Sequence, residues 1–480
     1  MEPGATTGIL ISIWTQSYNR APERAISGAC LGSTSQQNST RRARQKTSPT
    51  STSCLAAAPY QNVQTRWRIC KPDDSKDASL RLSPATVFVG LNSRSSGRRL
   101  HQCADPRRVR NMAGLFRSTA LGDLHLTNRI VMAPMTRSRA DERGVINSSA
   151  SEYYAARAGA GLIISEGINV GPMSNAFDRT PGLWTDEQTW GWKAVVDRIH
   201  EKGGRIIAQL WHAGRASARG LLSDKQPLSP SGVNDDLDQL QVWALLANGA
   251  YVRVAATPSR AMTLAEVQGA VNEFGLAAAN AVRAGFDGVE IHGANGYLVH
   301  QFLSPAINQR TDEYGGSIEG RSRLLLEIVA AISDVMPRSR IGLRLSPFAD
   351  YNSTRDPKPE DTYGWLAHWL QTTGLAYLHL ADTNAWTGAP DYERMLPIFG
   401  EHYRGPLIVN AGITPERADE IVVSGEADAV AFGRLFLANP DLPARIQAGG
   451  PYNSPWHFGI YGGSDTGYLD YPSLETVAKD

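Results

Sequence analysis

Cysteine is scarce in this 480-residue sequence, and none of its four cysteines lies beyond Cys103. Residues 104–480 can therefore form neither a disulfide nor a thiolate metal site. Long apolar runs are also missing, because no stretch approaches the ~20 apolar residues that a membrane-spanning helix needs. These absences argue against a secreted disulfide scaffold and an integral membrane protein, and we expect a soluble protein of the cell interior.

Several common catalytic signatures are absent as well. Gly159-Ala-Gly161 precedes its apolar run and lacks a third glycine, so it is not a dinucleotide-binding fingerprint. No G-x-S-x-G motif offers a serine nucleophile. His200, His212, His292 and His300 lack carboxylate or cysteine partners at ligand spacing, so we expect no metal site. Without a redox-active side chain, any electron transfer needs a bound cofactor.

Positive and negative charges are distributed unevenly along the chain. Residues 1–111 hold 17 Lys and Arg against 6 Asp and Glu, whereas the remaining residues hold 31 against 41. The first part is rich in Ser, Thr and Gln, and its apolar residues follow no sustained period. Such a composition cannot bury enough surface to offset its ordering entropy, so we expect residues 1–111 to form a disordered basic leader. Residues 112–480 then form the folded domain.

Three interpretations of the leader remain open. Residues 1–72 contain only Glu2 and Glu23 as acidic residues, which is typical of a transit peptide for a plastid or mitochondrion. Alternatively, Met112 is the true first residue and the protein is cytoplasmic, which is the interpretation we favour. A basic arm for an anionic partner fits least, because no interleaved aromatic residues support nucleic-acid binding.

From Met112 onward, short apolar runs alternate with longer amphipathic segments. The short runs are apolar along their whole length, as parallel strands covered on both faces are. This alternation indicates an α/β fold, and eight strands indicate a closed (β/α)8 TIM barrel. The expected strands are Ile130–Pro134, Leu162–Glu166, Arg205–Leu210, Gly288–His292, Ile341–Ser346, Tyr377–Ala381, Leu407–Asn410 and Ala429–Gly433.

Helix signals fill the intervals between these strands. Capping boxes at Thr185–Gln188 and Thr263–Glu266 predict two helix starts, and Thr414-Pro415 predicts a third. Two segments depart from the alternation. Leu115–Asn128 is expected to form a hairpin that closes the barrel floor, and the long excursion 215–262 after the third strand is expected to be functional. Glycines that end helices are expected at Gly203, Gly285, Gly374 and Gly425.

Polar or conformationally special residues gather at the carboxyl ends of the strands. In a TIM barrel these ends form the rim where binding and catalysis occur. We therefore predict one site at this rim. The residues expected there from the strand ends are Pro134–Thr136, Gln209, Trp211, His292, Arg344, Ser346, Asn410–Gly412 and Gly433-Arg434.

The stretch Gly288–Pro305 carries the most chemistry. If the segment after its strand turns like a helix, His292 and Asn295 lie on one face, about 5–6 Å apart at Cβ. Two neutral donors placed in this way can bind one oxygen atom, as in an oxyanion site. The phenol of Tyr297, with an ordinary pKa of about 10, stays protonated and can donate its proton. The stretch predicts a site that polarises a carbonyl and protonates a neighbouring carbon.

Cationic and glycine residues predict where an anion binds. Arg344 lies inside an apolar strand, where a buried charge requires an anionic partner from the protein or from a cofactor. Gly412 and Gly433 follow the last two strands, where backbone amides can approach a phosphate closely. Arg434 lies beside them and can bind a phosphate through two hydrogen bonds.

Six longer motifs occur in order between about Leu115 and Leu474. They are Ala133-Pro-Met-Thr-Arg137, Gln209-Leu-Trp-His-Ala-Gly-Arg215, His292-Gly-Ala-Asn-Gly-Tyr297, Asn308-Gln-Arg-Thr-Asp-Glu-Tyr-Gly-Gly316, Ala431-Phe-Gly-Arg434 and Tyr461-Gly-Gly-Ser-Asp-Thr-Gly-Tyr-Leu-Asp-Tyr-Pro472. Together they resemble the Old Yellow Enzyme family. Within it the chain is similar to the FMN-dependent ene-reductases of the N-ethylmaleimide reductase and 12-oxophytodienoate reductase types.

The resemblance implies a non-covalently bound FMN at the barrel rim. Thr136 would tune the flavin, Gln209 would bind its pyrimidine edge, and Arg344 would stabilise its anionic reduced form. The implied cofactor-binding residues are Ala133, Pro134, Met135, Thr136, Gln209, Arg344, Asn410, Gly412, Gly433 and Arg434.

The resemblance also implies a substrate side and a reaction. His292 and Asn295 would bind the substrate carbonyl oxygen, Tyr297 would protonate the α-carbon, and Trp211 and Tyr461 would line the pocket. NADPH or NADH would reduce the flavin, and after product release a hydride would pass from flavin N5 to the β-carbon of an α,β-unsaturated carbonyl compound. We expect these small molecules to be its partners, with the protein a monomer or homodimer.

Other functions remain as alternatives. Relatives that oxidise amines or reduce dienoyl thioesters need an iron–sulfur cluster, and the lack of cysteine after Cys103 argues against them. A flavin-binding barrel that acts as an isomerase or regulator without net reduction is the main alternative. The presence of Tyr297 argues against it but leaves it open.

Overall fold

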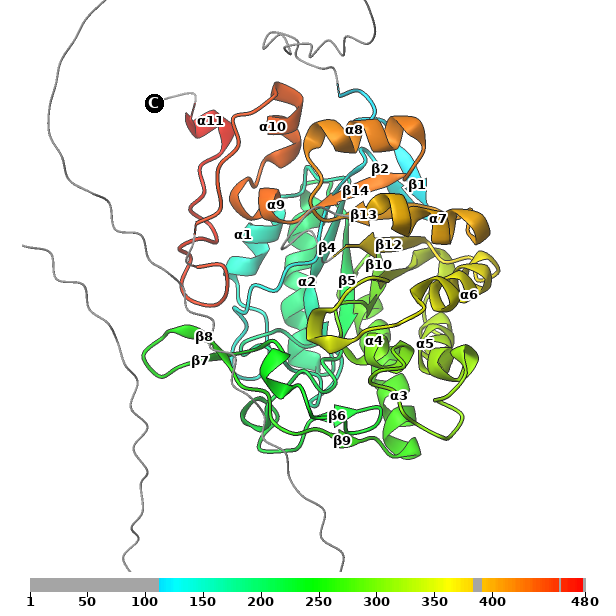
Figure 1. Cartoon of the computed structure of the whole chain (residues 1–480). Helices are drawn as coiled ribbons and strands as arrows, with labels where there is room; N and C mark the ends of the chain where they lie inside the picture. Colours follow the sequence, from blue (N-terminus) through cyan, green and yellow to red (C-terminus); the bar gives the residue numbers. More distant parts are fainter. Residues whose placement is uncertain (1–111, 383–390, 457–458, 478–480) are drawn as a thin grey trace, which may run out of the picture. The chain divides into compact units, whose positions relative to one another are not determined.

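The computed structural model describes residues 112–382, 391–456 and 459–477. Within them, eight parallel strands close into a barrel in the order β10-β11-β12-β13-β14-β3-β4-β5 (Figure 1). This barrel confirms the (β/α)8 prediction and the existence of all eight expected strands. They are β3 (Ile130–Met132), β4 (Leu162–Asn169), β5 (Ile206–Trp211), β10 (Gly288–Gly293), β11 (Ile341–Leu345), β12 (Tyr377–Ala381), β13 (Leu407–Asn410) and β14 (Ala429–Phe432).

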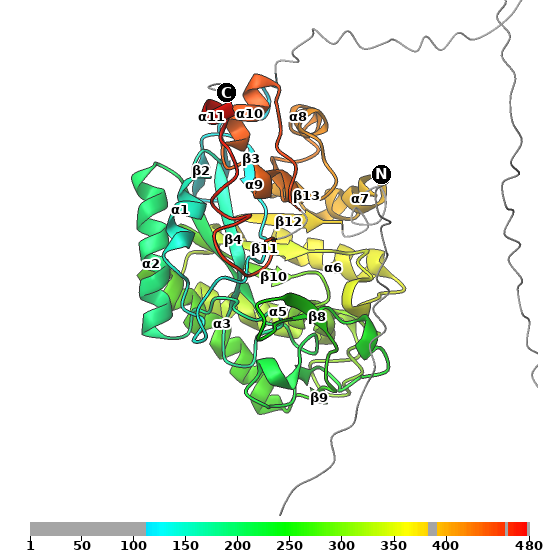
Figure 2. The same cartoon turned by 90° about the vertical axis from the view of Figure 1, so that its left-hand side faces the viewer.

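Helices lie outside the barrel and cover it (Figures 1 and 2). None of those in the described residues is both long enough and apolar enough to cross a membrane. The α-helices are α1 (Ser149–Ala155), α2 (Asp186–Glu201), α3 (Leu264–Ala284), α4 (Leu298–Leu303), α5 (Ile318–Ser333), α6 (Pro359–Gln371), α7 (Tyr392–His402), α8 (Pro415–Ser424), α9 (Arg434–Ala438), α10 (Leu442–Ala448) and α11 (Leu474–Val477). Short 3-10 turns occur at Arg219–Leu221, Leu237–Gln239, Arg338–Arg340 and Tyr351–Ser353.

The predicted helix boundaries are confirmed by their local hydrogen bonds. The hydroxyl of Thr185 accepts from the Gln188 amide, and the Gln188 side chain accepts in return from the Thr185 backbone. The same reciprocal pair joins Thr263 and Glu266 at the start of α3. The four predicted terminal glycines all have positive φ, the left-handed conformation that favours glycine: Gly203, Gly285, Gly374 and Gly425.

The expected hairpin closes the amino-terminal end of the barrel. Strands β1 (Thr119–Leu121) and β2 (Leu124–Leu126) pair in antiparallel fashion, and Leu121 and Leu124 pack against the inward residues of the barrel strands. Gly122 lies directly against the backbone of residues 339 and 376, just before β11 and β12, where a Cβ would overlap the Ser339 carbonyl oxygen. The hairpin therefore fills the floor of the barrel.

The predicted excursion after the third barrel strand forms small sheets of its own. Strands β6 (Leu228–Ser229) and β9 (Arg260–Ala261) pair in parallel, and β7 (Val242–Leu245) pairs with β8 (Tyr251–Val254) as a hairpin. The backbone of Phe177 also bridges to Trp243. The excursion thus brings the β7–β8 hairpin to the loop that follows β4.

Strand β4 continues three residues beyond its predicted end, to Asn169, because it contains a bulge. Its register with β5 shifts between Ile164 and Gly167. At this irregularity the carboxylate of Glu166 accepts hydrogen bonds from the backbone amides of Arg137 and Ser138, at 3.0 and 3.3 Å. Bulges re-aim side chains and are common at barrel rims. This one fixes the rim segment that follows β3.

Candidate active site

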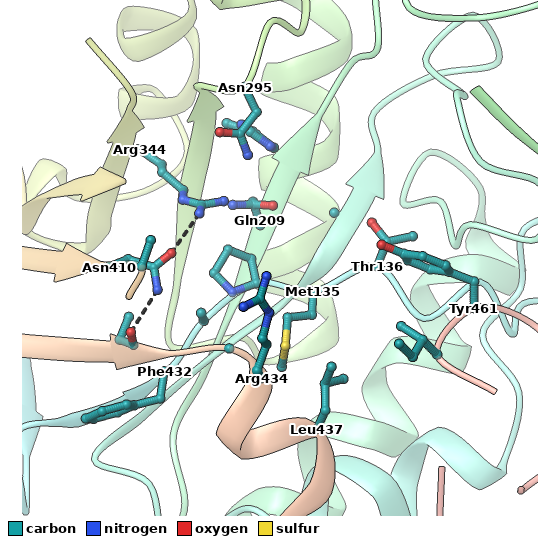
Figure 3. A pocket seen from close by; sticks show the side chains of 18 of the residues that line it. Met135, Thr136, Gln209, Asn295, Arg344, Asn410, Phe432, Arg434, Leu437 and Tyr461 are labelled. Atoms are coloured by element: carbon teal, nitrogen blue, oxygen red, sulfur yellow. Dashed lines mark hydrogen bonds between the residues drawn. The ribbon is translucent and has the colours of Figure 1, made fainter. Parts of the chain in front are cut away.

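A cavity of about 850 Å³ opens at the carboxyl ends of the barrel strands. Its volume lies in the upper part of the range for small-molecule sites. Figure 3 shows side chains from several strands pointing toward it. All of the residues predicted to bind cofactor or substrate line it: Ala133, Pro134, Met135, Thr136, Gln209, Trp211, His292, Asn295, Tyr297, Arg344, Asn410, Gly412, Gly433, Arg434 and Tyr461.

Arg344 has the buried anionic neighbour that the sequence required. Its Nη2 donates to Asn410 Oδ1 at 3.0 Å, and Asn410 in turn donates to the Ala431 carbonyl at 2.7 Å (Figure 3). Burial lowers the pKa of Arg344, and the negative charge of Glu290 on β10 acts in the opposite direction. The guanidinium is therefore positioned by β13 and balanced by a carboxylate of the chain itself.

The backbone after β13 adopts an unusual conformation at the cavity wall. Ala411 has a φ of +92° and Gly412 a φ of +69°, so a non-glycine residue is strained here. The hydroxyl of Tyr392 lies 2.6 Å from the Asn410 carbonyl and 2.5 Å from the Ala411 carbonyl and donates to them. Successive backbone N–H groups in a turn can form an anion-binding concavity. Arg434 points into the same region from the start of α9 (Figure 3).

His292 is a neutral hydrogen-bond donor. Burial lowers its pKa well below the ordinary 6.5, and the positive charge of Arg344 adds to the effect. The backbone amide of Ala294 donates to Nδ1 of the ring at 3.3 Å. A neutral ring whose Nδ1 accepts carries its proton on Nε2. His292 can therefore donate a hydrogen bond to a ligand through Nε2–H.

Asn295 reaches the cavity by a different route from the one predicted. Strand β10 runs to Gly293 and α4 begins only at Leu298, so the segment between them is a turn and the helical explanation was wrong. Asn295 has a φ of +56°, a conformation that asparagine tolerates better than most residues. Its backbone amide donates to Ser346 Oγ at 2.9 Å, and Asn352 Nδ2 donates to its carbonyl at 3.1 Å. These two bonds hold the turn and leave the carboxamide free.

Tyr297 is a buried phenol beside the imidazole. Its ring centroid lies 5.2 Å from that of His292 and 5.0 Å from that of Trp211, both in edge-to-face arrangements. Burial raises the pKa of Tyr297 well above its ordinary value of 10, and a hydrogen bond with Asn352 only partly opposes this. The phenol therefore keeps its proton at neutral pH.

Comparison with known proteins decides the family. Residues 114–453 match the model of the NADH:flavin oxidoreductase / NADH oxidase family. 12-oxophytodienoate reductase 2 of Arabidopsis thaliana is 40% identical over 365 residues, covering 75% of this chain and 95% of that protein. A probable flavin mononucleotide-dependent alkene reductase of Leishmania infantum is 37% identical, covering 75% and 97%. Morphinone reductase, solved in complex with tetrahydroNAD, superposes with a TM-score of 0.71 at 42% identity, covering 75% and 98%.

The chain belongs to the Old Yellow Enzyme family. It is an NAD(P)H-dependent flavin oxidoreductase, and its cofactor is FMN. The predicted family membership, enzyme class and cofactor are thus confirmed.

Unpartnered polar groups in this Old Yellow Enzyme family member fit a flavin nucleotide. Arg344 Nε, on the side assigned to the cofactor, is buried and has no hydrogen-bond partner among the described residues. Buried polar atoms of this kind call for a ligand or water to satisfy them. Arg434, in contrast, is an exposed cation on the cavity wall and is suited to a phosphate. In the part of the chain that the structure describes, no cluster of three or more metal-ligating side chains is present.

Sequence reasoning missed most of the aromatic wall of the cavity. Phe177, Trp243 and Tyr351 line it beside the predicted Trp211 and Tyr461. The Phe177 and Trp243 rings are nearly parallel with centroids 6.5 Å apart, and Trp243 lies 5.5 Å from Tyr461. The available signal was an aromatic residue inside the excursion 215–262, which was already expected to be functional.

Proposed function

We propose that this protein reduces the C=C bond of α,β-unsaturated carbonyl compounds at the expense of NAD(P)H. The observation that carries the proposal is the placement of His292, Asn295 and Tyr297 on one wall of the cavity that also contains Arg344. Two neutral donors and one retained phenolic proton are what activation of a carbonyl and protonation of its neighbour require. Relatives named as alkene and 12-oxophytodienoate reductases support the same reaction.

The carbonyl oxygen of the substrate is bound by His292 and Asn295. His292 donates from Nε2, because its Nδ1 is engaged by the Ala294 amide. Asn295 contributes its side-chain amide, whose direction is fixed by the held turn. Both groups are uncharged and almost fully buried, so their hydrogen bonds act in a medium of low dielectric constant. They draw electron density toward the oxygen and make the β-carbon electrophilic.

Tyr297 supplies the proton to the α-carbon. Its high pKa keeps the proton in place until negative charge develops on the substrate. FMN held by Gln209, Arg344 and Arg434 would supply the hydride-transfer chemistry between NAD(P)H and the alkene. Because one cavity holds all of these residues, NAD(P)H and the alkene occupy it in turn, which is a ping-pong sequence. The aromatic wall of Phe177, Trp211 and Trp243 excludes water from this step.

Absorbance spectroscopy tests the proposal directly. Purified protein should be yellow, lose its flavin absorbance with NADPH in the absence of oxygen, and regain it on addition of 2-cyclohexenone. Mass spectrometry should then identify cyclohexanone in a one-to-one ratio to the NADPH consumed. A yellow, NADPH-reducible protein that no enone reoxidises would contradict the proposal. An enone converted without consumption of NADPH would favour the isomerase alternative.

A further inference from the structure

A carboxylate that the proposed reaction does not use lies inside the barrel next to the cofactor-facing residues. Glu290 on β10 is fully buried. Gln209 Nε2 donates to its Oε1 at 2.7 Å, and the Tyr377 hydroxyl donates to its Oε2 at 3.0 Å. His379 Nδ1 lies 2.9 Å from the same Oε2 and completes the set of three hydrogen bonds. Glu290 does not itself line the cavity, but Gln209 does.

The strand register builds this arrangement. Glu290 and Gln209 are direct partners in the parallel pair β10–β5, so the two side chains extend side by side. The partner of Glu290 on the other neighbouring strand, β11, is Gly342. A Cβ at Gly342 would lie 2.2 Å from the Tyr377 ring and 2.5 Å from its hydroxyl. The glycine therefore opens the path by which the phenol of β12 reaches Glu290, which explains a glycine inside a central strand.

The charge of Glu290 dictates how the Gln209 amide is turned. Burial raises the pKa of Glu290, but the hydrogen bonds from His379 and Gln209 and the positive charge of Arg344 outweigh burial, so the pKa lies below its ordinary value and the carboxylate stays ionised. An ionised carboxylate is only an acceptor, so it must face the NH₂ group of the amide. Gln209 Oε1 is thereby left without a partner among the described residues. In the reverse orientation two acceptor oxygens would face each other in a buried site.

The network also places one negative charge beside Arg344. His379 is the register partner of Arg344 on β12, and burial lowers its pKa, so the imidazole stays neutral. The buried group as a whole then holds the carboxylate of Glu290 and the guanidinium of Arg344, and the two charges offset each other. Removal of the carboxylate would leave an uncompensated positive charge at the cofactor-facing end of the barrel.

We propose that Glu290 is a positioning residue of the FMN site, which orients the Gln209 carbonyl toward the imide N–H of the flavin and lowers the reduction potential of bound FMN by balancing Arg344. The first effect is a hydrogen-bond effect and depends on where the carboxylate lies. The second is a charge effect and depends only on its ionisation. Two substitutions at the same position therefore separate them.

Glu290→Gln removes the charge and allows the amide of Gln209 to turn over. We expect the equilibrium constant for two-electron reduction of bound FMN to increase about tenfold, a positive shift of about 30 mV. Glu290→Asp keeps the charge and withdraws the carboxylate from Gln209 by one methylene group. We expect its reduction potential to stay near that of the wild type. Both potentials are measured on the holoprotein against a reference dye.

The orientation of Gln209 is read out with N3-methyl-FMN, which lacks the imide N–H. Wild-type protein should bind FMN much more tightly than the methylated analogue in fluorescence titrations, because a buried acceptor loses its donor. Both Glu290 variants should lose most of this discrimination, by at least fivefold. Tyr377→Phe is the matched control, because it removes one hydrogen bond to the same carboxylate but leaves its charge and its contact with Gln209. Tyr377→Phe should change neither the equilibrium constant for FMN reduction nor the ratio of the affinities for FMN and N3-methyl-FMN by more than about twofold.

The outcomes distinguish positioning from a structural role. If the Glu290 variants and Tyr377→Phe change potential and discrimination equally, Glu290 is only a structural member of the barrel and the inference is overturned. If Glu290→Gln does not fold, Glu290→Asp decides alone. An unchanged preference of Glu290→Asp for FMN over N3-methyl-FMN overturns the inference. Loss of that preference at an unchanged reduction potential supports it. None of these measurements uses an enone, so failure of the proposed alkene reduction would not affect them.

Discussion

Arg137 Nε donates a hydrogen bond of 3.1 Å to the backbone carbonyl of Ile460, the residue before Tyr461. Its Nη2 donates to the Gly467 carbonyl at 2.9 Å. Arg137 directly follows Thr136 on the cavity rim, so the segment expected to contact the flavin also holds the loop that carries Tyr461 on the substrate side. The two halves of the site are joined over more than 300 residues of sequence.

Arg139→Gln should weaken substrate binding without weakening FMN binding to the same extent. Arg139 donates to the carbonyls of Ser464 and Gly459, at 3.1 and 2.8 Å, and so holds the loop at a distance from the cofactor residues. Each charge-assisted hydrogen bond of this kind contributes about 1.5–3 kcal/mol to the stability of the folded loop, so its loss makes the loop less ordered. We expect KM for 2-cyclohexenone to rise about tenfold, with the Kd for FMN within threefold of the wild type.

The control for this prediction is Arg143→Gln. Arg143 forms an exposed ion pair with Asp141 at 3.3 Å on the same segment, and exposed pairs contribute little. It should leave KM and Kd unchanged. If the affinity for FMN fell in Arg139→Gln by as much as KM rose, the arginine would support the whole rim rather than the substrate loop.

Tyr297→Phe should separate the two half-reactions. The substitution removes the phenolic proton but keeps the ring that packs against Trp211 and His292. Reduction of the bound flavin by NADPH should proceed at the wild-type rate, whereas reoxidation by 2-cyclohexenone should slow about 10²–10⁴-fold, the usual range for loss of a general acid. Stopped-flow absorbance measures each step alone. Equal slowing of both steps would assign Tyr297 to cofactor placement.

Glu273→Gln should stabilise the protein at high pH and have no effect at low pH. Burial raises the pKa of Glu273 from 4.5 to about 7. The folded state then binds more protons than the unfolded state between these values, so the stability linked to Glu273 is present below pH 4.5 and lost as pH rises through 7. Glutamine cannot ionise. The unfolding free energy at pH 8.5 should therefore rise by about 2 kcal/mol, measured by urea unfolding.

Glu266→Gln on the same helix is the control of opposite sign. The hydrogen-bonded guanidinium of Arg260 lowers the pKa of Glu266 to about 2. The stability linked to this carboxylate is present above pH 4.5 and lost as pH falls toward 2. Glu266→Gln should thus lower the urea midpoint at pH 7, where Glu273→Gln leaves it equal or raises it. Shifts of the same sign in both variants would refute the assignment of a buried, unpaired charge to Glu273.

Trp243→Leu should impair the reduction of an aromatic α,β-unsaturated carbonyl compound more than that of 2-cyclohexenone. The Trp243 ring contacts Phe177 and Tyr461 at the cavity wall, and such aromatic pairs contribute about 0.5–1.5 kcal/mol beyond area burial. We expect kcat/KM for cinnamaldehyde to fall about fivefold more than that for 2-cyclohexenone. Trp190→Leu on α2 is the control, because that side chain is 58% exposed and does not line the cavity. Equal losses for both substrates would show that Trp243 only supports the hairpin.

The sequence predicted those features that depend on local signals. Apolar runs and helix caps identified the eight strands, and barrel closure then brought their carboxyl ends together. That is why residues as distant as Thr136 and Arg434 were correctly assigned to one cavity. The position of Trp243 depends instead on the pairing of β7 with β8 and on the contact of that hairpin with the loop after β4. No periodicity in the sequence encodes such a contact.

Two further features show where residue patterns were insufficient. Glu290 was treated only as part of the strand Gly288–His292. Its contact with Gln209 became visible only from the register of β10 with β5. Asn295 lines the cavity as predicted, but the helical reason given for it was wrong. Its turn is held by Ser346, directly after β11, and by Asn352 in the 3-10 turn Tyr351–Ser353. In both cases the deciding contacts come from segments far away in the sequence, so they were not visible along a single stretch.

A chain begun at Met112 should fold, bind FMN and reduce 2-cyclohexenone with the kcat/KM of the full chain. The family match begins at residue 114, and the backbone amide of Leu115 is already bound to Asp419 of α8 at 3.0 Å. A shorter chain begun at residue 123 is the control. It lacks β1 and the buried Leu121 of the barrel floor, so its urea midpoint should fall clearly. Lost FMN binding in the Met112 protein would show that residues 1–111 contribute to the fold, and the mass of the native N-terminus would then distinguish a retained leader from a removed transit segment.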